Sequence, residues 1–224
     1  MTQDEAPSMA DLTLDELRVA LAPAIADNAV FDGWTTDALD LAAEQNDVDP
    51  DIARLAFKGG AVQMVGAWIE SVDSAMVAAN PSEALAQLPI RERIRTLVQF
   101  RLDAIAGQEE ALKRATAILA MPQNVPASLR LGWRSADLMW RLAGDTATDY
   151  NHYTKRMILG GIYAATLAVF ANDESEDKAE TRAFLDRRIE GVMRFEKAKA
   201  KLTSTERETF SLTRFLGRLR YPGT

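Results

Sequence analysis

Residues 13–60 read "TLDELRVALAPAIADNAVFDGWTTDALDLAAEQNDVDPDIARLAFKGG", and this stretch decides the fold class. It opens with a capping box, in which the hydroxyl of Thr13 and the carboxylate of Glu16 satisfy each other's backbone donors. The box predicts a helix that begins at Thr13 and runs to about residue 32. Gly33 ends this helix, because glycine tolerates the backbone conformation that follows a last helical turn.

Two shorter helices follow in the same stretch. The first is predicted over residues 36–45. Asp49 and Pro50 then supply an N-cap and a first-turn proline for the next helix, which stops at Gly59-Gly60. Three helices with a tight turn at this spacing are typical of a helix-turn-helix unit.

The rest of the chain also has helical periodicity, and no segment alternates convincingly with period two. Glycine and proline fall between the helical segments far more often than inside them. The predicted helices are 61–79, 90–106, 108–120, 127–143, 149–171 and 176–202. We therefore predict an all-α protein with three parts: a helix-turn-helix unit over 1–60, a helical bundle over 61–202 and an amphipathic helix over 203–224.

Composition excludes several kinds of site. The chain has no cysteine and one histidine, His152, so thiolate chemistry and a paired-histidine di-iron site are excluded. No serine or cysteine constellation accompanies His152, and we expect neither a catalytic residue, a metal site nor a cofactor. The apolar run over 157–170 is shorter than the roughly 20 residues that span a bilayer, and the acidic N-terminus resembles no targeting segment. We expect a protein that is not exported, with His152 on a recognition surface.

The predicted helix-turn-helix unit is strongly acidic. Residues 1–58 hold thirteen acidic side chains against three basic ones. A small three-helix unit followed by longer helices resembles the TetR-type architecture, which implies a homodimer with an enclosed ligand pocket. DNA binding needs lysine and arginine against the phosphates. Arg54 and Lys58 of the candidate recognition helix lie among carboxylates, so we expect no nucleic-acid partner and call the unit degenerate.

The C-terminal tail has the opposite charge. Residues 209–224 contain three arginines and no acid. The apolar residues of this tail recur at helical spacing and are flanked by arginines, which is typical of a helix lying on an anionic membrane surface. The predicted membrane-binding residues are Leu212, Arg214, Phe215, Leu216, Arg218 and Leu219.

Three stretches resemble one known family. They are "MPQNVPASL" (121–129), "DLMWRLAGDTATDYNHYTKRMILGGIYAATLAVFANDES" (137–175) and "TRAFLDRRI" (181–189). They look like the ubiquinone (coenzyme Q) biosynthesis accessory proteins numbered nine in the Coq series. The resemblance is strongest over 120–195 and extends in layout to the helix-turn-helix half and the basic tail.

The resemblance implies a lipid-binding TetR-like protein that does not bind DNA and is not an enzyme. Members of the family bind isoprenoid lipids and support the di-iron hydroxylase acting late in ubiquinone synthesis. The partner-docking patch of the family matches this sequence at Asp137, Met139, Tyr153 and Arg156. At the remaining position the family has tryptophan and this chain has His152, which supplies less apolar area.

Together these features predict a lipid-binding accessory factor of ubiquinone biosynthesis. It would take an isoprenoid quinone intermediate from the membrane and present it to the hydroxylase, since long isoprenoid tails leave a bilayer reluctantly. We expect it at the inner face of a bacterial membrane, or on the matrix side in a processed mitochondrial form. A TetR-type ligand-responsive regulator is the alternative. The predicted pocket residues are Trp133, Trp140, Met157, Ile162 and Leu167.

Two features of the 127–171 region allow two interpretations each. Leu129, Trp133 and Trp140 fall on one helical face, which packs inward as core or lines a lipid pocket. Gly160 and Gly161 lie inside a predicted helix, where glycine is unfavourable, so they indicate either close helix packing or room for a ligand.

Overall fold

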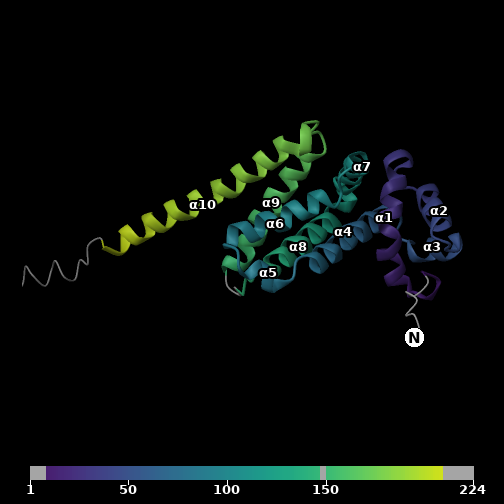
Figure 1. Cartoon of the computed structure of the whole chain (residues 1–224), viewed down its shortest axis with the longest axis horizontal. Coiled ribbons are helices and arrows are strands. Elements are labelled where there is room, and N and C mark those ends of the chain that lie inside the picture. Colours follow the sequence, from purple (N-terminus) through teal and green to yellow (C-terminus); the bar gives the residue numbers. More distant parts are fainter. Residues whose placement is uncertain (1–8, 147–149, 209–224) are drawn as a thin grey trace, which may run out of the picture. The chain divides into compact units, whose positions relative to one another are not determined.

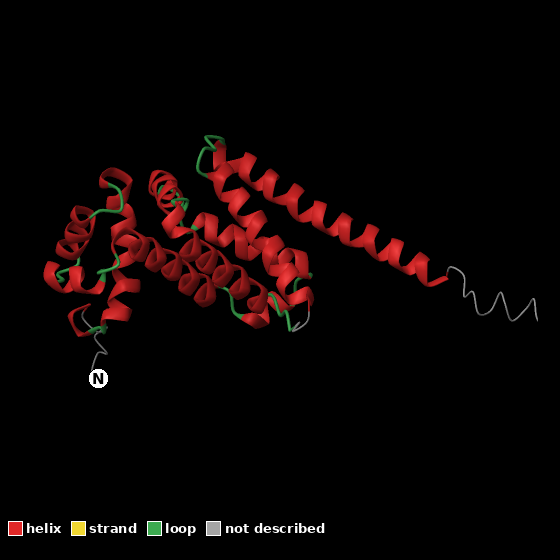
Figure 2. Ribbon diagram, turned by 180° about the vertical axis from the view of Figure 1, so that it is seen from behind, coloured by secondary structure: helices red, strands yellow, loops and turns green. Residues whose placement is uncertain are grey.

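The computed structural model describes residues 9–146 and 150–208 of the 224-residue chain, and these residues form helices and loops with no strand among them (Figures 1 and 2). The prediction of an all-α fold is confirmed. The α-helices are α1 (Leu14–Asp32), α2 (Thr36–Gln45), α3 (Pro50–Ala56), α4 (Gly60–Ala79), α5 (Ser82–Ala86), α6 (Ile90–Asp103), α7 (Glu109–Leu119), α8 (Val125–Leu142), α9 (Tyr150–Phe170) and α10 (Ala179–Glu208).

Contacts divide the chain into two compact units, residues 1–185 and 186–224. The first unit contains α1 to α9 and the start of α10. The described part of the second unit is the remainder of α10, where Arg194 and Glu190 form an ion pair one turn apart, with 2.7 Å between Nη2 and Oε1. None of the helices within the described residues is long and apolar enough to cross a membrane.

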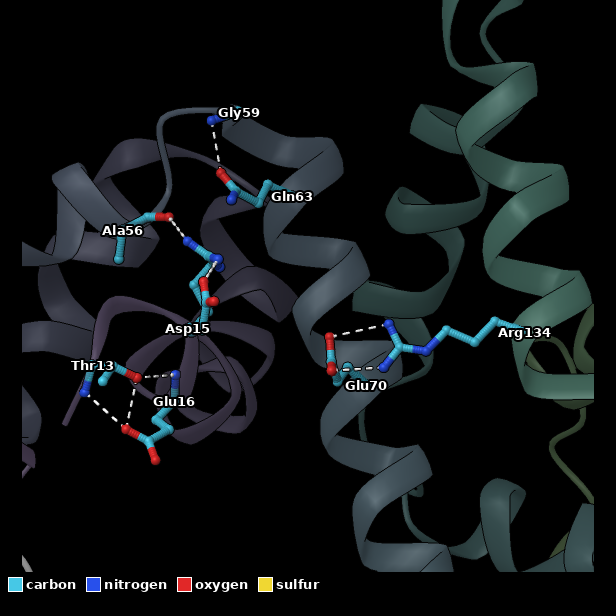
Figure 3. A network of polar contacts seen from close by, with 9 residues as sticks. Thr13, Asp15, Glu16, Ala56, Gly59, Gln63, Glu70 and Arg134 are labelled. Atoms are coloured by element: carbon cyan, nitrogen blue, oxygen red, sulfur yellow. Dashed lines mark hydrogen bonds and ion pairs between the residues drawn. The ribbon is translucent and has the colours of Figure 1, made fainter. Parts of the chain in front are cut away.

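The first three helices begin and end where local sequence chemistry places them. Thr13 and Glu16 form the predicted capping box, with 2.6 Å between the Thr13 hydroxyl and the Glu16 carboxylate (Figure 3). Gly33 closes α1 with φ of 73°, a conformation that side chains disfavour. Asp49 caps α3, and Pro50 occupies its first turn.

The three-helix unit packs on the rest of the first unit through α1, which contacts α4 and α7 as well as α2 and α3. Trp34, in the loop after α1, is buried and donates a hydrogen bond from Nε1 to the carbonyl of Ala111, 3.0 Å away. Its ring lies 5.3 Å from that of Trp68 on α4. Because these contacts join α1, α4 and α7, the helix-turn-helix unit shares a core with the bundle.

Helix α4 packs against α1, α6, α7 and α8. Its buried residues include Met64, Trp68, Val72 and Met76, which recur every four positions along one side. A second link lies on its exposed side, where Glu70 accepts a hydrogen bond from Arg134 of α8 at 2.6 Å (Figure 3). The spacing of its apolar residues thus gives α4 a central place in the first unit.

The largest differences from the predicted helices are one missed helix and one helix end. Helix α5 (Ser82–Ala86) was not predicted, because five residues after a proline carry too little periodicity to show a pattern. The last helix begins at Ala179 and continues to Glu208, past the predicted end at residue 202. A single α-helix therefore crosses the predicted border between the bundle and the tail.

Candidate functional site

The first unit contains a cavity of about 270 Å³. Residues of α4, α6, α7, α8 and α9, and of the loops after α6 and α7, surround it. The lining residues are Val65, Trp68, Ile69, Val72, Arg101, Ile105, Leu112, Ala115, Thr116, Leu119, Ala120, Ser128, Leu131, Gly132, Ser135, Gly160, Tyr163, Ala164 and Leu167. Most of these side chains are apolar, and Arg101 is the one charged residue among them.

Four helices contribute to the cavity with the same spacing. Each presents residues i, i+3, i+4 and i+7, which is one face of an α-helix. The four sets are 65, 68, 69 and 72 on α4; 112, 115, 116 and 119 on α7; 128, 131, 132 and 135 on α8; and 160, 163, 164 and 167 on α9. The cavity therefore arises because four helices direct one face to a common centre.

Two glycines leave space at the cavity wall. A Cβ atom built on Gly132 or Gly160 meets no other described atom within 4 Å. The neighbouring Gly161 is exposed and does not line the cavity. Of the two interpretations of the Gly160-Gly161 pair, room beside a cavity fits Gly160, and close packing fits neither glycine among the described residues.

A buried polar cluster forms one part of the cavity wall. Arg101, 2% exposed, forms an ion pair with Asp73, which is also buried. Nη2 of Arg101 donates to the hydroxyl of Ser135 at 3.3 Å, and that hydroxyl donates to Asp73 Oδ2 at 3.2 Å. The guanidinium lies 5.0 Å from the ring centre of Tyr163, and its Nε–H has no hydrogen-bond partner among the residues that the structure describes. Burial lowers the pKa of Arg101, but Tyr163 and Asp73 outweigh it and raise the pKa above its ordinary value.

Of the predicted pocket residues, Leu167 lines the cavity. Trp133, Trp140, Met157 and Ile162 are absent from its lining. Trp140 instead donates from Nε1 to the carbonyl of Lys155 at 3.0 Å, between α8 and α9. The prediction that the Trp face of α8 packs inward is also wrong in part. Leu129 is 70% exposed, and the buried residues of α8 are Ser135, Ala136 and Met139.

The predicted docking residues divide between a surface and the core beneath it. Tyr153 is 58% exposed, and its ring lies 5.8 Å from Trp133 and 5.1 Å from His152. Met139 is fully buried, and Arg156 is 2% exposed. A partner can therefore touch the aromatic group of Trp133, His152 and Tyr153, but not Met139 or Arg156 without rearrangement.

Arg156 holds the α8–α9 hairpin together. Its Nε donates to Asp137 on α8 at 2.5 Å, and its Nη1 donates to Asp145, in the loop after α8, at 3.1 Å. Asp137 also pairs with Arg141, and Asp145 with Lys155 at 2.6 Å. Burial raises the pKa values of both aspartates, but these cations outweigh it and hold both values below the ordinary range.

Comparison with known proteins identifies the part of the chain that contains this hairpin. The family model COQ9 matches residues 125–196, which begin with α8 and include α9. The mitochondrial ubiquinone biosynthesis protein COQ9 of Homo sapiens is 31% identical over 180 residues, covering 77% of this chain and 56% of the human protein. The chain is a relative of the COQ9 proteins.

Other relatives carry the same name. The COQ9 protein of Rattus norvegicus is 41% identical over 112 residues, covering 50% of this chain and 36% of the rat protein. That of Xenopus tropicalis is 31% identical and covers 77% of this chain. The chain spans 56% of the human and frog COQ9 proteins.

A solved structure shares the fold of this COQ9 relative. The TetR transcriptional regulator from Nitrosomonas europaea ATCC 19718 superposes with a TM-score of 0.60 and 26% identity, covering 78% of this chain and 96% of the regulator. The predicted TetR-like architecture is confirmed.

In the helix-turn-helix unit of this COQ9 relative, one arginine forms ion pairs with two aspartates. Arg54 of α3 donates to both carboxylate oxygens of Asp40, at 2.9 and 2.6 Å, and to Asp51 at 2.9 Å. Hydrogen bonding to Asp40 raises the pKa of Arg54 above its ordinary value. The guanidinium that would face a duplex is therefore occupied by two carboxylates of its own unit.

The remaining predicted sites lie outside the described part. Leu212, Arg214, Phe215, Leu216, Arg218 and Leu219 belong to residues 209–224, beyond the described residues. Within the described residues of this COQ9 relative, no group of three or more histidine, aspartate or glutamate side chains is placed to hold a metal ion.

Proposed function

We propose that this chain acts in ubiquinone biosynthesis as a lipid-binding accessory protein without catalytic activity of its own. The names of its relatives support the pathway. The single observation that supports lipid binding is the cavity, whose lining is mostly apolar. Transfer of apolar surface from water into such a cavity is favourable, at about 25 cal/mol per Å².

The proposed ligand is an isoprenoid lipid or ubiquinone intermediate. The cavity is bordered by the exposed residues Thr116, Ala120, Gly132 and Ala164, which leave it a rim at the protein surface. A ligand can therefore occupy the cavity with one end and extend past the rim with the other. The arginine-rich tail, by its sequence, would hold the protein on the membrane from which the lipid is taken.

Presentation to an enzyme is the second half of the proposed function. The partner is the hydroxylase of ubiquinone biosynthesis, and the docking surface is the aromatic group of Trp133, His152 and Tyr153. Tyr153 is exposed and the other two side chains are partly exposed, and aromatic side chains grouped at a surface are typical of interface hot spots. The site of action would be the inner face of a bacterial membrane or the matrix side of a mitochondrial one, and the protein would act as a homodimer.

A pair of adjacent glycines tests the cavity. Leucine at Gly160 extends into the cavity, whereas leucine at Gly161 extends from the exposed side of the same helix turn. Both changes favour helix formation by a similar amount, about 1 kcal/mol. Native mass spectrometry of the purified chain should find co-purified isoprenoid lipid in wild type and in Gly161→Leu, and lose it in Gly160→Leu. Equal lipid content in the two variants would reject the cavity as the binding site.

Two single alanine variants, one in the aromatic group and one on another helix, test the docking surface. Tyr153→Ala should abolish co-purification of the hydroxylase, because it removes the most exposed ring of the aromatic group. Phe31→Ala on α1 is the matched control, since Phe31 is also exposed but lies in the helix-turn-helix unit. Loss of the hydroxylase with both variants, or with neither, contradicts this surface.

A TetR-type ligand-responsive regulator is the second candidate, and the superposition on the Nitrosomonas europaea regulator favours it. The carboxylates around Arg54 argue against it, because they compete with phosphates for the guanidinium. Sequence-specific, salt-sensitive binding to genomic DNA fragments would support the regulator, and its absence at low salt would leave the accessory protein.

A further inference from the structure

The polar cluster of the cavity is balanced in charge. The guanidinium of Arg101 and the carboxylate of Asp73 form a direct ion pair, and both residues are buried. Ser135 closes the arrangement by accepting from the arginine and donating to the aspartate. A ligand that enters this part of the cavity therefore meets a neutral pair and no spare positive charge.

One donor of this pair has no acceptor among the described residues. The Nε–H of Arg101 is buried without a hydrogen-bond partner in this part of the chain, while Arg101 itself lines the cavity. An unsatisfied buried donor is costly, and a ligand that supplies an acceptor removes this cost. An anion would accept the bond too, but it would bring a second negative charge next to Asp73 in a region of low dielectric.

The volume of the cavity further limits which ligands fit. A cavity of about 150 Å³ lined by apolar side chains is known to hold one benzene molecule. The 270 Å³ observed here fits one substituted six-membered ring and falls short of a long isoprenoid chain. Trp68 and Tyr163 provide aromatic walls for such a ring.

The two ends of the cavity differ in exposure. Arg101 and Ser135 are each 2% exposed, whereas the rim residues Gly132 and Ala164 are exposed. A polar ring thus finds its donor at the buried end, and an attached chain leaves over the rim.

We propose that the cavity binds the uncharged, oxygen-bearing ring of its ligand, such as a benzoquinone or phenol, with a ring oxygen accepting the Nε–H of Arg101 and the apolar chain pointing outward. This inference rests on the proposed function that the cavity holds the lipid. It adds the orientation, ring inside and chain outside, and the preference for a neutral acceptor over a phosphate or carboxylate.

Three probes with the same decyl chain separate the possibilities in calorimetric titrations of the full chain: decylbenzoquinone, decylbenzene and decyl phosphate. Decylbenzoquinone should bind about tenfold more tightly than decylbenzene, the effect of one hydrogen bond that is otherwise unmade. Decyl phosphate should be the weakest of the three. Equal affinity for decylbenzoquinone and decylbenzene would overturn the role of Arg101, and tightest binding of decyl phosphate would overturn the neutral-acceptor preference.

A paired substitution assigns the effect to the cluster. Arg101→Met with Asp73→Leu removes both charges and leaves neither unpaired, which proteins tolerate better than removal of one partner. The double variant should bind decylbenzoquinone and decylbenzene equally. Arg134→Met with Glu70→Leu is the matched control, because that ion pair also joins α4 to a neighbouring helix but neither residue lines this cavity (Figure 3). An unchanged preference in the Arg101 variant would contradict the proposal.

A spectroscopic measurement on wild type does not depend on the folding of any variant. The infrared carbonyl stretch of bound decylbenzoquinone should move to lower frequency than in hexane, as expected when a carbonyl accepts a hydrogen bond, and an unshifted band would overturn the proposal. The same probes distinguish failure of the proposed cavity site from failure of the proposed ring recognition. If Gly160→Leu leaves the binding of all three probes unchanged, the cavity itself is not the site. If it blocks all three while their affinities are equal, the cavity binds lipid without recognising its head.

Discussion

Replacing Arg156 by alanine should destabilise the first unit without acting through a partner. The guanidinium is 2% exposed and neutralises two carboxylates, those of Asp137 and Asp145. Removal of one member of a buried ion pair costs about 3–5 kcal/mol, because a buried charge is left without compensation. Asp137 retains Arg141 and Asp145 retains Lys155. We therefore expect the low end of that range, about 3 kcal/mol.

Tyr153→Ala is the control for the destabilisation expected of Arg156→Ala. Tyr153 is also a predicted docking residue, but it is 58% exposed, and its ring contacts are with Trp133 and His152. Loss of aromatic contacts costs about 0.5–1.5 kcal/mol each beyond the buried area, and less where water reaches the rings. The expected cost is about 1 kcal/mol.

Urea unfolding followed by far-UV circular dichroism measures both free energies. The two variants should differ by about 2 kcal/mol, with Arg156→Ala the less stable. If Arg156→Ala unfolds within about 0.5 kcal/mol of wild type, as a surface substitution does, then the buried ion-pair network is not what holds the hairpin. In that case the prediction of Arg156 as a docking residue would stand, and loss of hydroxylase binding by this variant would support it.

Three further predictions concern caps and turns. Thr13→Ala should cost about 1 kcal/mol in urea unfolding, because it removes the two hydrogen bonds of the Thr13 hydroxyl at the start of α1. Gly33→Ala should lower the thermal midpoint, since φ of 73° strains any side chain, whereas Gly107→Asn, at φ of 86° with open space for a Cβ, should be milder because asparagine tolerates this region. Asp173 accepts bonds from Ser175 and Thr181; burial raises its pKa, but these bonds outweigh it and hold the pKa well below its usual range. The stability from this lowered pKa is present above the ordinary value of 3.8 and is lost as pH falls toward the folded pKa, so thermal midpoints measured from about pH 7 to about pH 3 should fall less steeply for Asp173→Asn than for wild type.

Local signals along the chain were sufficient for the helices. Capping by Thr13, termination at Gly33 and the proline at the start of α3 depend on residues within a few positions of one another, and each was predicted where the structure has it. The all-α class follows from the same signals. Helix α5 was missed because it is too short to show periodicity.

The cavity was only partly visible in the sequence. The four sets of residues at i, i+3, i+4 and i+7 are an available signal, but every amphipathic helix has such a face. Leu167 was predicted and lines the cavity, whereas Trp133 and Trp140 were chosen for their size and lie elsewhere. Arg101, which supplies the polar donor of the cavity, gave no signal, because an arginine on a helix is usually exposed.

The sequence by itself determined the helical class, the helix-turn-helix spacing, the acidic character of that unit and the similarity to COQ9 proteins, since these depend on residue order and charge. Tertiary structure decided which residues are buried. Arg156 and Met139 lie inside and Tyr153 lies at the surface although all three match one docking pattern. The physical reason is that burial of a charge depends on partners from other segments. Asp73 reaches Arg101 from α4, and Asp137 reaches Arg156 from α8. Periodicity within one helix carries no information about which neighbouring helix supplies the compensating charge.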